Sequence, residues 1–395
     1  MKALALLFLP LAACSSLSVS TDFEGGNLGK VEQVSATHFR CAVAGQSDQD
    51  GRNRQASWYS FRLDGAKGKE VTITLTDLRG EYNYKPGGLC VRDDTPPVVS
   101  SDGITWRHLE RISLEKDEAT FRVTPEADTL WIAHIEPYTA SRLDRFLDEI
   151  RGAAHLKDEV IGKSVEGRDL HLLTITEFAA ESSSPPPTVW LMCRQHAWET
   201  GTSFVGEGAI RFLLSDEAAP LRKTLVFKIL PMMDPDGCAH GGVRFNRHGY
   251  DVNRNWDTAD PENPEHRRLM PEICAAKKVI HAFSGLFLTL HNQETDEWLS
   301  SSEKNKAVAA RFFAALVEKT TFNPSAKGPR PSAGKPAPGR ASVYEYLDAQ
   351  RGMAAFLLEQ GITRSSKLGR LPTSQDRLEF GRQLIRVMAD VAMGK

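Results

Sequence analysis

Apolar runs typical of β-strands alternate with helical segments after residue 139, and no other feature constrains the fold of this chain as strongly. The predicted strands cover residues 170–176, 188–193, 224–230, 286–290 and 354–358. The predicted helices cover residues 141–155, 200–214, 264–283, 303–319 and 374–393. This order is typical of an α/β domain whose central sheet carries helices on both faces. We therefore assign residues 139–395 to one α/β domain.

A different pattern covers residues 31–138, where short β-forming runs are separated by turns rich in Gly, Pro and Asp. These runs are residues 58–63, 70–75, 120–123 and 129–135. Their length and spacing predict a small antiparallel β-sandwich as an accessory domain.

The first 30 residues indicate export. Lys2 precedes an apolar run that is too short to span a bilayer, and we interpret residues 1–13 as a signal peptide. The Leu-Ala-Ala sequence before Cys14 resembles a bacterial lipobox, in which that cysteine is acylated and becomes the new N-terminus. Residues 14–30 would then form a tether, and we expect a periplasmic or outer-membrane lipoprotein with the lipid as its only membrane anchor. An ordinary signal peptide, or a start site assigned too early, would leave Cys14 without a role.

The composition matches a folded globular protein, with 41% hydrophobic and 25% charged residues. The chain has 49 Lys plus Arg residues and 51 Asp plus Glu residues, which gives a formal net charge of -2. No bulk positive field therefore attracts nucleic acid or anionic lipid, and neither is expected as a partner.

Five cysteines follow Cys14, and none forms a CxxC motif, which argues against a zinc site made of cysteines alone. Cys41 and Cys90 are candidates for a disulfide in an oxidising compartment, although the sequence cannot fix the pairing. We expect Cys193 and Cys274 to be buried thiols.

Candidate metal ligands lie at the ends of two predicted strands. His196 and Glu199 form an HxxE pair between the strand at 188–193 and the helix at 200–214, and His291 follows the strand at 286–290. Open α/β sheets place their sites at this rim, so the three side chains can face one point. Two histidines and one glutamate leave a fourth position open for water, which is typical of catalytic zinc.

Further candidates are two arginines, an asparagine and a glutamate. Arg244, Asn253 and Arg254 follow the strand at 224–230, and a guanidinium is suited to pair with a carboxylate or steady an oxyanion. Glu359 ends the predicted strand at 354–358. The alternatives are surface ion pairs for the arginines and a solvated strand end for the glutamate. The stretch 322–340 is rich in Pro, Gly and Lys, which predicts an irregular loop at the rim of a site.

The order of these motifs resembles that of M14-type zinc metallocarboxypeptidases, in particular the cytosolic-carboxypeptidase-like branch, which has an N-terminal β-sandwich. The matching segments are VIGKSVEGRDL, RQHAWET, DPDG, VRFNRHGYDVNRNWD, LTLHNQ and FLLEQG. The segments SWYSFRLDGAKGKEVTITLTDLRGEYNYKPG and EADTLWIAHIEPYT resemble the accessory domain of that branch. The resemblance implies a mixed central sheet in a zinc carboxypeptidase domain at 139–395.

The resemblance also implies a role for each candidate. One Zn²⁺ ion would be held by His196, Glu199 and His291, and Arg244 would stabilise the oxyanion. The terminal carboxylate of a peptide or protein substrate would bind Asn253 and Arg254, and Glu359 would be the general base. Such an enzyme would remove C-terminal residues in the cell envelope by means of a metal-activated water.

The chain departs from the family pattern in several places. Asp234 replaces the usual Asn of NPDG, and Ala197–Trp198 replaces the Pro-Gly frequent in this branch, which could alter the pocket wall. The capping tyrosine of digestive members has no match, although Tyr344 and Tyr346 lie nearby. Arg340 is a candidate for binding an acidic substrate side chain, with an exposed loop arginine as the alternative.

Two other functions remain open from the sequence. An aspartoacylase-like zinc amidohydrolase acting on N-acyl amino acids would share the ligand set and the fold. A non-catalytic binding lipoprotein on a peptidase scaffold is the other alternative. The carboxypeptidase is preferred because Arg244 and Arg254 suit a peptide end and the sandwich domain is present.

Overall fold

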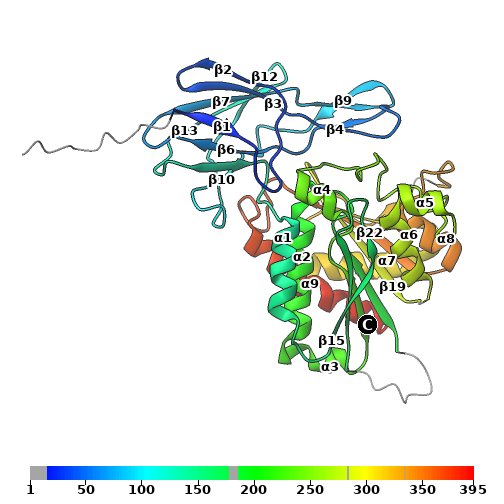
Figure 1. Ribbon diagram of the computed structural model, residues 1–395. Helices are drawn as coiled ribbons and strands as arrows, with labels where there is room; N and C mark the ends of the chain where they lie inside the picture. The colour runs from blue at the N-terminus through cyan, green and yellow to red at the C-terminus, as the bar shows by residue number, and fades with distance from the viewer. Residues whose placement is uncertain (1–15, 178–185, 283, 333) are drawn as a thin grey trace, which may run out of the picture.

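A computed structural model describes residues 16–177, 186–282, 284–332 and 334–395. Figure 1 shows a β-rich N-terminal domain next to a larger domain in which helices surround a sheet. The predicted signal peptide and Cys14 lie outside the described residues. No helix in the described ranges is long and apolar enough to cross a membrane.

Two five-stranded sheets form the sandwich of the N-terminal domain. One sheet contains, in spatial order, β1 (Ser18–Ser20), β6 (Ser60–Asp64), β14 (Leu130–Ala133), β10 (Val98–Ser100) and β11 (Arg107–His108). The other contains β12 (Ser113–Glu115), β13 (Glu118–Val123), β7 (Val71–Thr76), β3 (His38–Ala42) and β2 (Val31–Ser35). Buried side chains such as Phe61, Ile73 and Phe121 fill the space between the sheets, so apolar burial holds the two sheets together.

The structure corrects two expectations for this domain. Strand β3 pairs with β7 in parallel, so the sandwich is not wholly antiparallel. Strand β1 pairs with β6, which places part of the predicted 14–30 tether inside the sheet. The reason is that Leu17, Val19 and Leu28 pack against the sandwich core, and this burial favours a folded segment over a free tether.

The candidate disulfide between Cys41 and Cys90 is not formed, because both cysteines are free, buried thiols. Cys41 lies on β3, whereas Cys90 follows a strand of another sheet. Cys193 and Cys274 are buried free thiols, as predicted.

A third, four-stranded sheet projects from the sandwich toward the α/β domain (Figure 1). Its strands are β4 (Gln46–Ser47), β5 (Arg54–Gln55), β8 (Arg79–Tyr82) and β9 (Lys85–Leu89). Strands β8 and β9 form a hairpin whose turn residues, Asn83 and Tyr84, both have positive φ, as a type I′ turn requires.

The α/β domain contains an eight-stranded mixed sheet. Its strands, in spatial order, are β15 (Leu156–Lys163), β16 (Asp169–Ile175), β18 (Val226–Leu230), β17 (Thr188–Met192), β19 (Leu286–Gln293), β22 (Ala354–Gly361), β20 (Trp298–Ser301) and β21 (Arg330–Pro331). The four central strands from β18 to β22 are parallel. Their carboxyl ends therefore lie at one edge of the sheet, where α/β proteins place their sites.

Helices cover both faces of this sheet, as predicted. They are α1 (Ala140–Ile150), α2 (Thr200–Leu214), α3 (Ala219–Arg222), α4 (Pro235–His240), α5 (Pro264–Leu269), α6 (Pro271–His281), α7 (Lys306–Lys319), α8 (Val343–Arg351) and α9 (Ser374–Ala392). In β17, Val189 and Leu191 join the core beneath α2 and α9, whereas Trp190 and Met192 join the core beneath α6 and α8. Both faces of β17 are thus buried, which explains its unbroken apolar sequence.

Several elements differ from the sequence prediction. The helix expected at 264–283 is two helices, α5 and α6, because Pro271 has no N–H to continue the first one. The Asp-Pro-Asp-Gly segment begins helix α4, with Asp234 as its N-cap. Strand β15 was not predicted, because most of its residues are partly or fully exposed and it lacks an apolar pattern.

The two domains share an apolar and polar interface. Trp58 of the N-terminal domain lies in one buried cluster with Trp198 of the HxxE segment. The Trp198 ring stacks on His134, with centroids 6.1 Å apart, and Ser57 Oγ donates a hydrogen bond to Glu294 Oε1 at 3.0 Å. The Ala197–Trp198 departure therefore packs against the N-terminal domain.

Candidate active site

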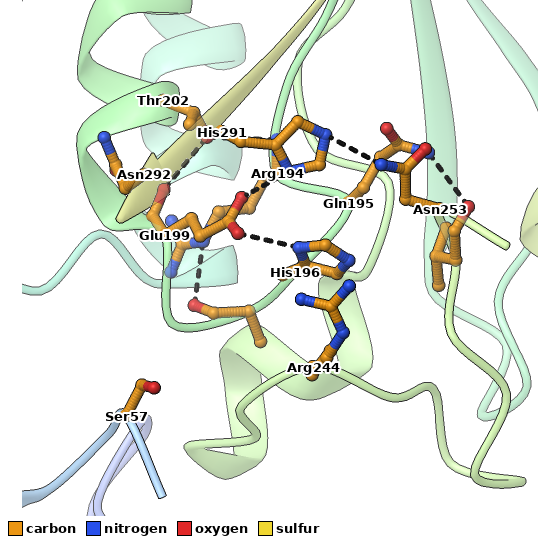
Figure 2. Close-up of polar contacts among 12 residues, drawn as sticks. Ser57, Arg194, Gln195, His196, Glu199, Thr202, Arg244, Asn253, His291 and Asn292 are labelled. Carbon is orange, nitrogen blue, oxygen red and sulfur yellow. Dashed lines mark hydrogen bonds and ion pairs between the residues drawn. The ribbon is translucent and has the colours of Figure 1, made fainter. Parts of the chain in front are cut away.

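Three buried side chains converge at the carboxyl ends of the parallel strands. His196 and Glu199 lie in the turn between β17 and α2, and His291 lies on the neighbouring strand β19. Nδ1 of His196 is 2.7 Å from Glu199 Oε1, and Nδ1 of His291 is 2.9 Å from Glu199 Oε2. Figure 2 shows the three groups pointing toward one another. One ligand atom from each residue lies within 4.8 Å of the others, which is close enough to hold a single metal ion.

The chemistry of this donor set fits Zn²⁺. Two imidazole nitrogens and one carboxylate leave a coordination position open, as catalytic zinc sites do. Burial alone would raise the pKa of Glu199, but the two histidines hold this pKa at about 2. The carboxylate is therefore ionised and ready to bind a cation at neutral pH.

The outer ring nitrogens of both histidines are held by other groups. His196 Nε2 lies 3.0 Å from Asp251 Oδ1, and His291 Nε2 lies 3.2 Å from Thr289 Oγ1. Donation from Nε2 to the Asp251 carboxylate leaves Nδ1 of His196 unprotonated and able to bind a metal. Asp251 was not predicted from the sequence, although its place two residues before Asn253 was a usable signal.

The turn that carries His196 is fixed by two residues that sequence reasoning missed. Arg194 has a positive φ of 57° and donates from Nε to the carbonyl oxygen of Ala197 at 2.9 Å. Gln195 donates from Nε2 to the carbonyl oxygen of Val252 at 2.9 Å. These bonds tie the turn to itself and to the segment that carries Asp251.

Arg244 reaches the metal ligands through a shared carboxylate. Its Nε donates to Asp251 Oδ2 at 2.8 Å, while the other oxygen of Asp251 faces His196. Figure 2 shows the Arg244 guanidinium beside the His196 ring. A donor at this place can stabilise negative charge that develops next to the metal.

Arg254 lines a cleft of about 230 Å³ that both domains form. Its Nη1 donates to the backbone oxygen of Asn253 at 2.7 Å, and within the described ranges it has no ion-pair partner. Burial lowers the pKa of Arg254, as do the positive charges of Arg244 and Arg340. The Arg254 guanidinium therefore brings a positive charge to the cleft. No acidic side chain of the described residues forms an ion pair with it.

Asn253, which was predicted to bind the substrate carboxylate together with Arg254, has a different environment. Asn253 is buried, its Oδ1 accepts a hydrogen bond from the backbone N–H of Val343 at 3.1 Å, and its Nδ2 lies 3.2 Å from His291 Nε2. Asn253 is not among the residues that line the cleft. Its contact with substrate stays a prediction, whereas its contact with His291 is observed.

Glu359 lies beside the cluster of His196, Glu199 and His291. Strand β22 pairs with β19 so that Glu359 is directly opposite His291. The Oε2 atom of Glu359 is buried and has no hydrogen-bond partner among the described residues. Burial is the main cause that raises the pKa of the Glu359 carboxyl, and the negative charge of Glu199 raises this pKa further. A carboxyl group with this tendency to hold a proton suits acid–base chemistry.

Comparison with known families agrees with this geometry. The zinc carboxypeptidase model of peptidase family M14 matches residues 144–330, and the cytosolic carboxypeptidase N-terminal domain matches residues 19–135. This chain carries a peptidase M14 zinc carboxypeptidase domain. The resemblance seen in the sequence is thus confirmed for both parts of the chain.

Several known proteins are similar to this chain. Mouse cytosolic carboxypeptidase 6 is 31% identical over 270 residues, which are 64% of this chain and 48% of that protein. The chain thus spans about half the length of this relative. A metallo-carboxypeptidase from Burkholderia cenocepacia has the same fold, with a TM-score of 0.83, 23% identity, and coverage of 96% of this chain and 100% of that one. A metallo-carboxypeptidase from Pseudomonas aeruginosa gives a TM-score of 0.79 at 21% identity, over 94% of this chain and 98% of that one.

Asp234, which replaces the usual Asn of the family, makes its contacts within the carboxypeptidase domain. Asp234 caps helix α4 by accepting a hydrogen bond from Gly237 N at 2.9 Å, and its Oδ2 is buried with no partner among the described residues. Burial raises the pKa of Asp234 to about 7. An aspartic acid that keeps its proton resembles asparagine, so the cap is preserved.

Tyrosines near the site differ in their relation to the cleft. Tyr346 bonds through its hydroxyl to His281 Nε2 at 2.9 Å, and Tyr344 is buried, so neither lines the cleft. Tyr82, from the N-terminal domain, does line it, and its hydroxyl lies 3.4 Å from Nη2 of Arg340. Sequence reasoning missed Tyr82 because it belongs to the other domain.

Proposed function

We propose that this protein is a zinc-dependent carboxypeptidase that removes the last residue from the free C-terminus of a peptide or protein. One observation carries the proposal. Arg254 lies in the cleft beside the metal cluster and has no ion-pair partner among the described residues. A substrate carboxylate is the anion that such an arginine is suited to bind.

The side chains support a hydrolytic mechanism. Bound Zn²⁺ would polarise the scissile carbonyl group and lower the pKa of a water molecule. Arg254 binds the terminal carboxylate and thereby orients the last peptide bond. Glu359 takes a proton from the attacking water and later gives it to the leaving amine. Arg244 stabilises the negative charge that develops on the carbonyl oxygen.

The cleft also favours a particular substrate side chain. Arg340 lines the cleft together with Arg254 and has no ion-pair partner within the described ranges. Its second positive charge favours a C-terminal residue with an acidic side chain. Arg340→Ala should therefore reduce kcat/KM for peptides ending in Glu more than for matched peptides ending in Leu.

The sequence supports a location in the cell envelope. The apolar run before Cys14 and the lipobox-like residues next to it indicate export and acylation. Metabolic labelling with a fatty-acid analogue tests this point. The parent should incorporate the label and fractionate with membranes, whereas Cys14→Ser should do neither.

The activity is tested with purified protein that begins at residue 16 and is loaded with zinc. Peptides with free C-termini should each lose a single C-terminal residue, as detected by mass spectrometry. Hydrolysis of small N-acyl amino acids without cleavage of peptides would identify an amidohydrolase instead. Peptide binding without any hydrolysis would identify a binding protein.

A further inference from the structure

A glutamine of the N-terminal domain holds the loop that carries Arg244. The Oε1 atom of Gln46 accepts hydrogen bonds from three consecutive backbone N–H groups, those of Val243, Arg244 and Phe245, at 2.9, 2.7 and 2.9 Å. The Nε2 atom of Gln46 donates to the backbone oxygen of Phe245 at 2.6 Å. One side chain from about 200 positions earlier in the sequence thus makes four bonds to this loop.

The same loop is joined to the metal centre at two points. The backbone oxygen of Val243 accepts a hydrogen bond from the N–H of Trp198 at 3.0 Å. Trp198 lies between His196 and Glu199. The side chain of Arg244 bonds to Asp251, which in turn faces His196. A displacement of the loop would therefore move Arg244 relative to the metal ligands.

A second contact shows how closely the two segments approach. Gln49 N donates to the backbone oxygen of Gly249 at 3.1 Å. Gly249 has a φ of +83°, and a Cβ atom there would lie 2.5 Å from Gln49 N. Only glycine allows both this backbone conformation and this close approach. The segment after β4 and the Arg244 loop therefore form one closely fitted unit.

We propose that Gln46 is a positioning residue for Arg244, so that the N-terminal domain helps to build the active site. This inference rests on the proposed carboxypeptidase function. Gln46 itself does not touch the reacting atoms. It fixes the backbone at Arg244. The guanidinium is therefore already in place when negative charge develops on the oxyanion, and such preorganisation is the condition for effective electrostatic stabilisation.

The test uses Gln46→Met, which keeps the length of the side chain but removes its hydrogen bonds, and Gln46→Glu, which keeps an acceptor oxygen. Gln33→Met on the exposed strand β2 is the matched control. We expect Gln46→Met to lower kcat by about 10-fold or more, since small misplacements of catalytic groups are costly. The KM value and the zinc content should change less than about twofold. Gln46→Glu should recover part of the lost kcat, and Gln33→Met should equal the parent.

A double-mutant cycle separates positioning from general stability. In the Arg244→Ala background, Gln46→Met should lower kcat by less than about twofold, because the group that it positions is already absent. An equal loss in both backgrounds would overturn the proposal, and so would an unchanged kcat in Gln46→Met alone.

Amide hydrogen exchange gives a second readout that does not need activity. The amides of residues 243–245 should exchange faster in Gln46→Met than in the parent, while the amides of the sandwich strands keep their protection. Unchanged exchange would overturn the inference even if the parent proved to have no peptidase activity. Inactivity of the parent with faster exchange in the variant would reject the proposed function alone and retain the role of Gln46 in fixing the loop.

Discussion

The carboxylate of Asp251 lies 3.0 Å from Nε2 of His196, on the side of the ring away from Glu199. This contact selects the ring nitrogen that faces the metal position. The other oxygen of Asp251 accepts a hydrogen bond from Arg244. One buried carboxylate therefore orients both a metal ligand and the group that is expected to stabilise the oxyanion.

Asp251→Ala should weaken zinc binding by about 10- to 100-fold, the range found when the hydrogen-bond partner of a ligand histidine is lost. Titration with a competing chromogenic chelator measures this change. Glu262→Ala, at a highly exposed acid outside the site, is the control and should bind zinc as the parent does. Equal zinc affinity in Asp251→Ala and the parent would show that Asp251 does not support the ligand.

Zinc content should depend directly on the two histidines. The purified parent should contain about one zinc per chain, and His196→Ala combined with His291→Ala should contain almost none, because two of the three protein ligands are gone. Elemental analysis measures the content, and His155→Ala, at an exposed histidine, is the matched control. Stoichiometric zinc in the double variant would refute the ligand assignment.

Glu359→Gln should separate catalysis from metal binding. The amide keeps the size of the side chain but cannot accept the proton, so kcat should fall by about 10²-fold or more. Zinc content should remain that of the parent, because Glu359 is not one of the three clustered ligand residues. A variant nearly as active as the parent would show that another group is the base.

Asp234→Asn should change how stability depends on pH. The pKa of Asp234 is raised by burial to about 7 in the folded state, compared with about 3.9 for an unfolded chain. Between these values the folded state binds a proton that the unfolded state lacks, so the free energy of unfolding of the parent falls as the pH rises from about 4 to about 7. The variant lacks this contribution.

Urea unfolding at several pH values measures the difference. The stability of Asp234→Asn relative to the parent should increase by roughly 2 to 3 kcal/mol between pH 5 and pH 8, since one pKa unit corresponds to about 1.4 kcal/mol. The same pH dependence in both proteins would mean that Asp234 titrates normally.

The fold and the cluster of His196, Glu199 and His291 were accessible from the sequence because their signals are local. Strand β17 is buried on both faces and therefore reads as an unbroken apolar run, and His196 and Glu199 follow it directly. The position of a polar residue at a strand end is enough to place it at the rim of the sheet.

Other features were not accessible, because they depend on contacts between distant segments. Gln46 meets the Arg244 loop only after the two domains pack, and nothing in its local sequence indicates a role. Tyr82 reaches the cleft for the same reason. Strand β1 looked like part of a tether, since three residues with mixed polarity carry a weak β signal until β6 pairs with them.

The central claim is that Arg254 binds the free C-terminal carboxylate of the substrate, and one cycle of measurements tests it. The kcat/KM values of the parent and Arg254→Ala are compared on a peptide with a free C-terminus and on its C-terminal amide. Removing one partner of a desolvated charge pair costs about 2 to 5 kcal/mol. Amidation of the peptide and truncation of the arginine should therefore each reduce kcat/KM strongly, and the two changes together should cost little more than either alone, because each removes the same pair. Cleavage of the amidated peptide by the parent at the rate of the free peptide would contradict the account.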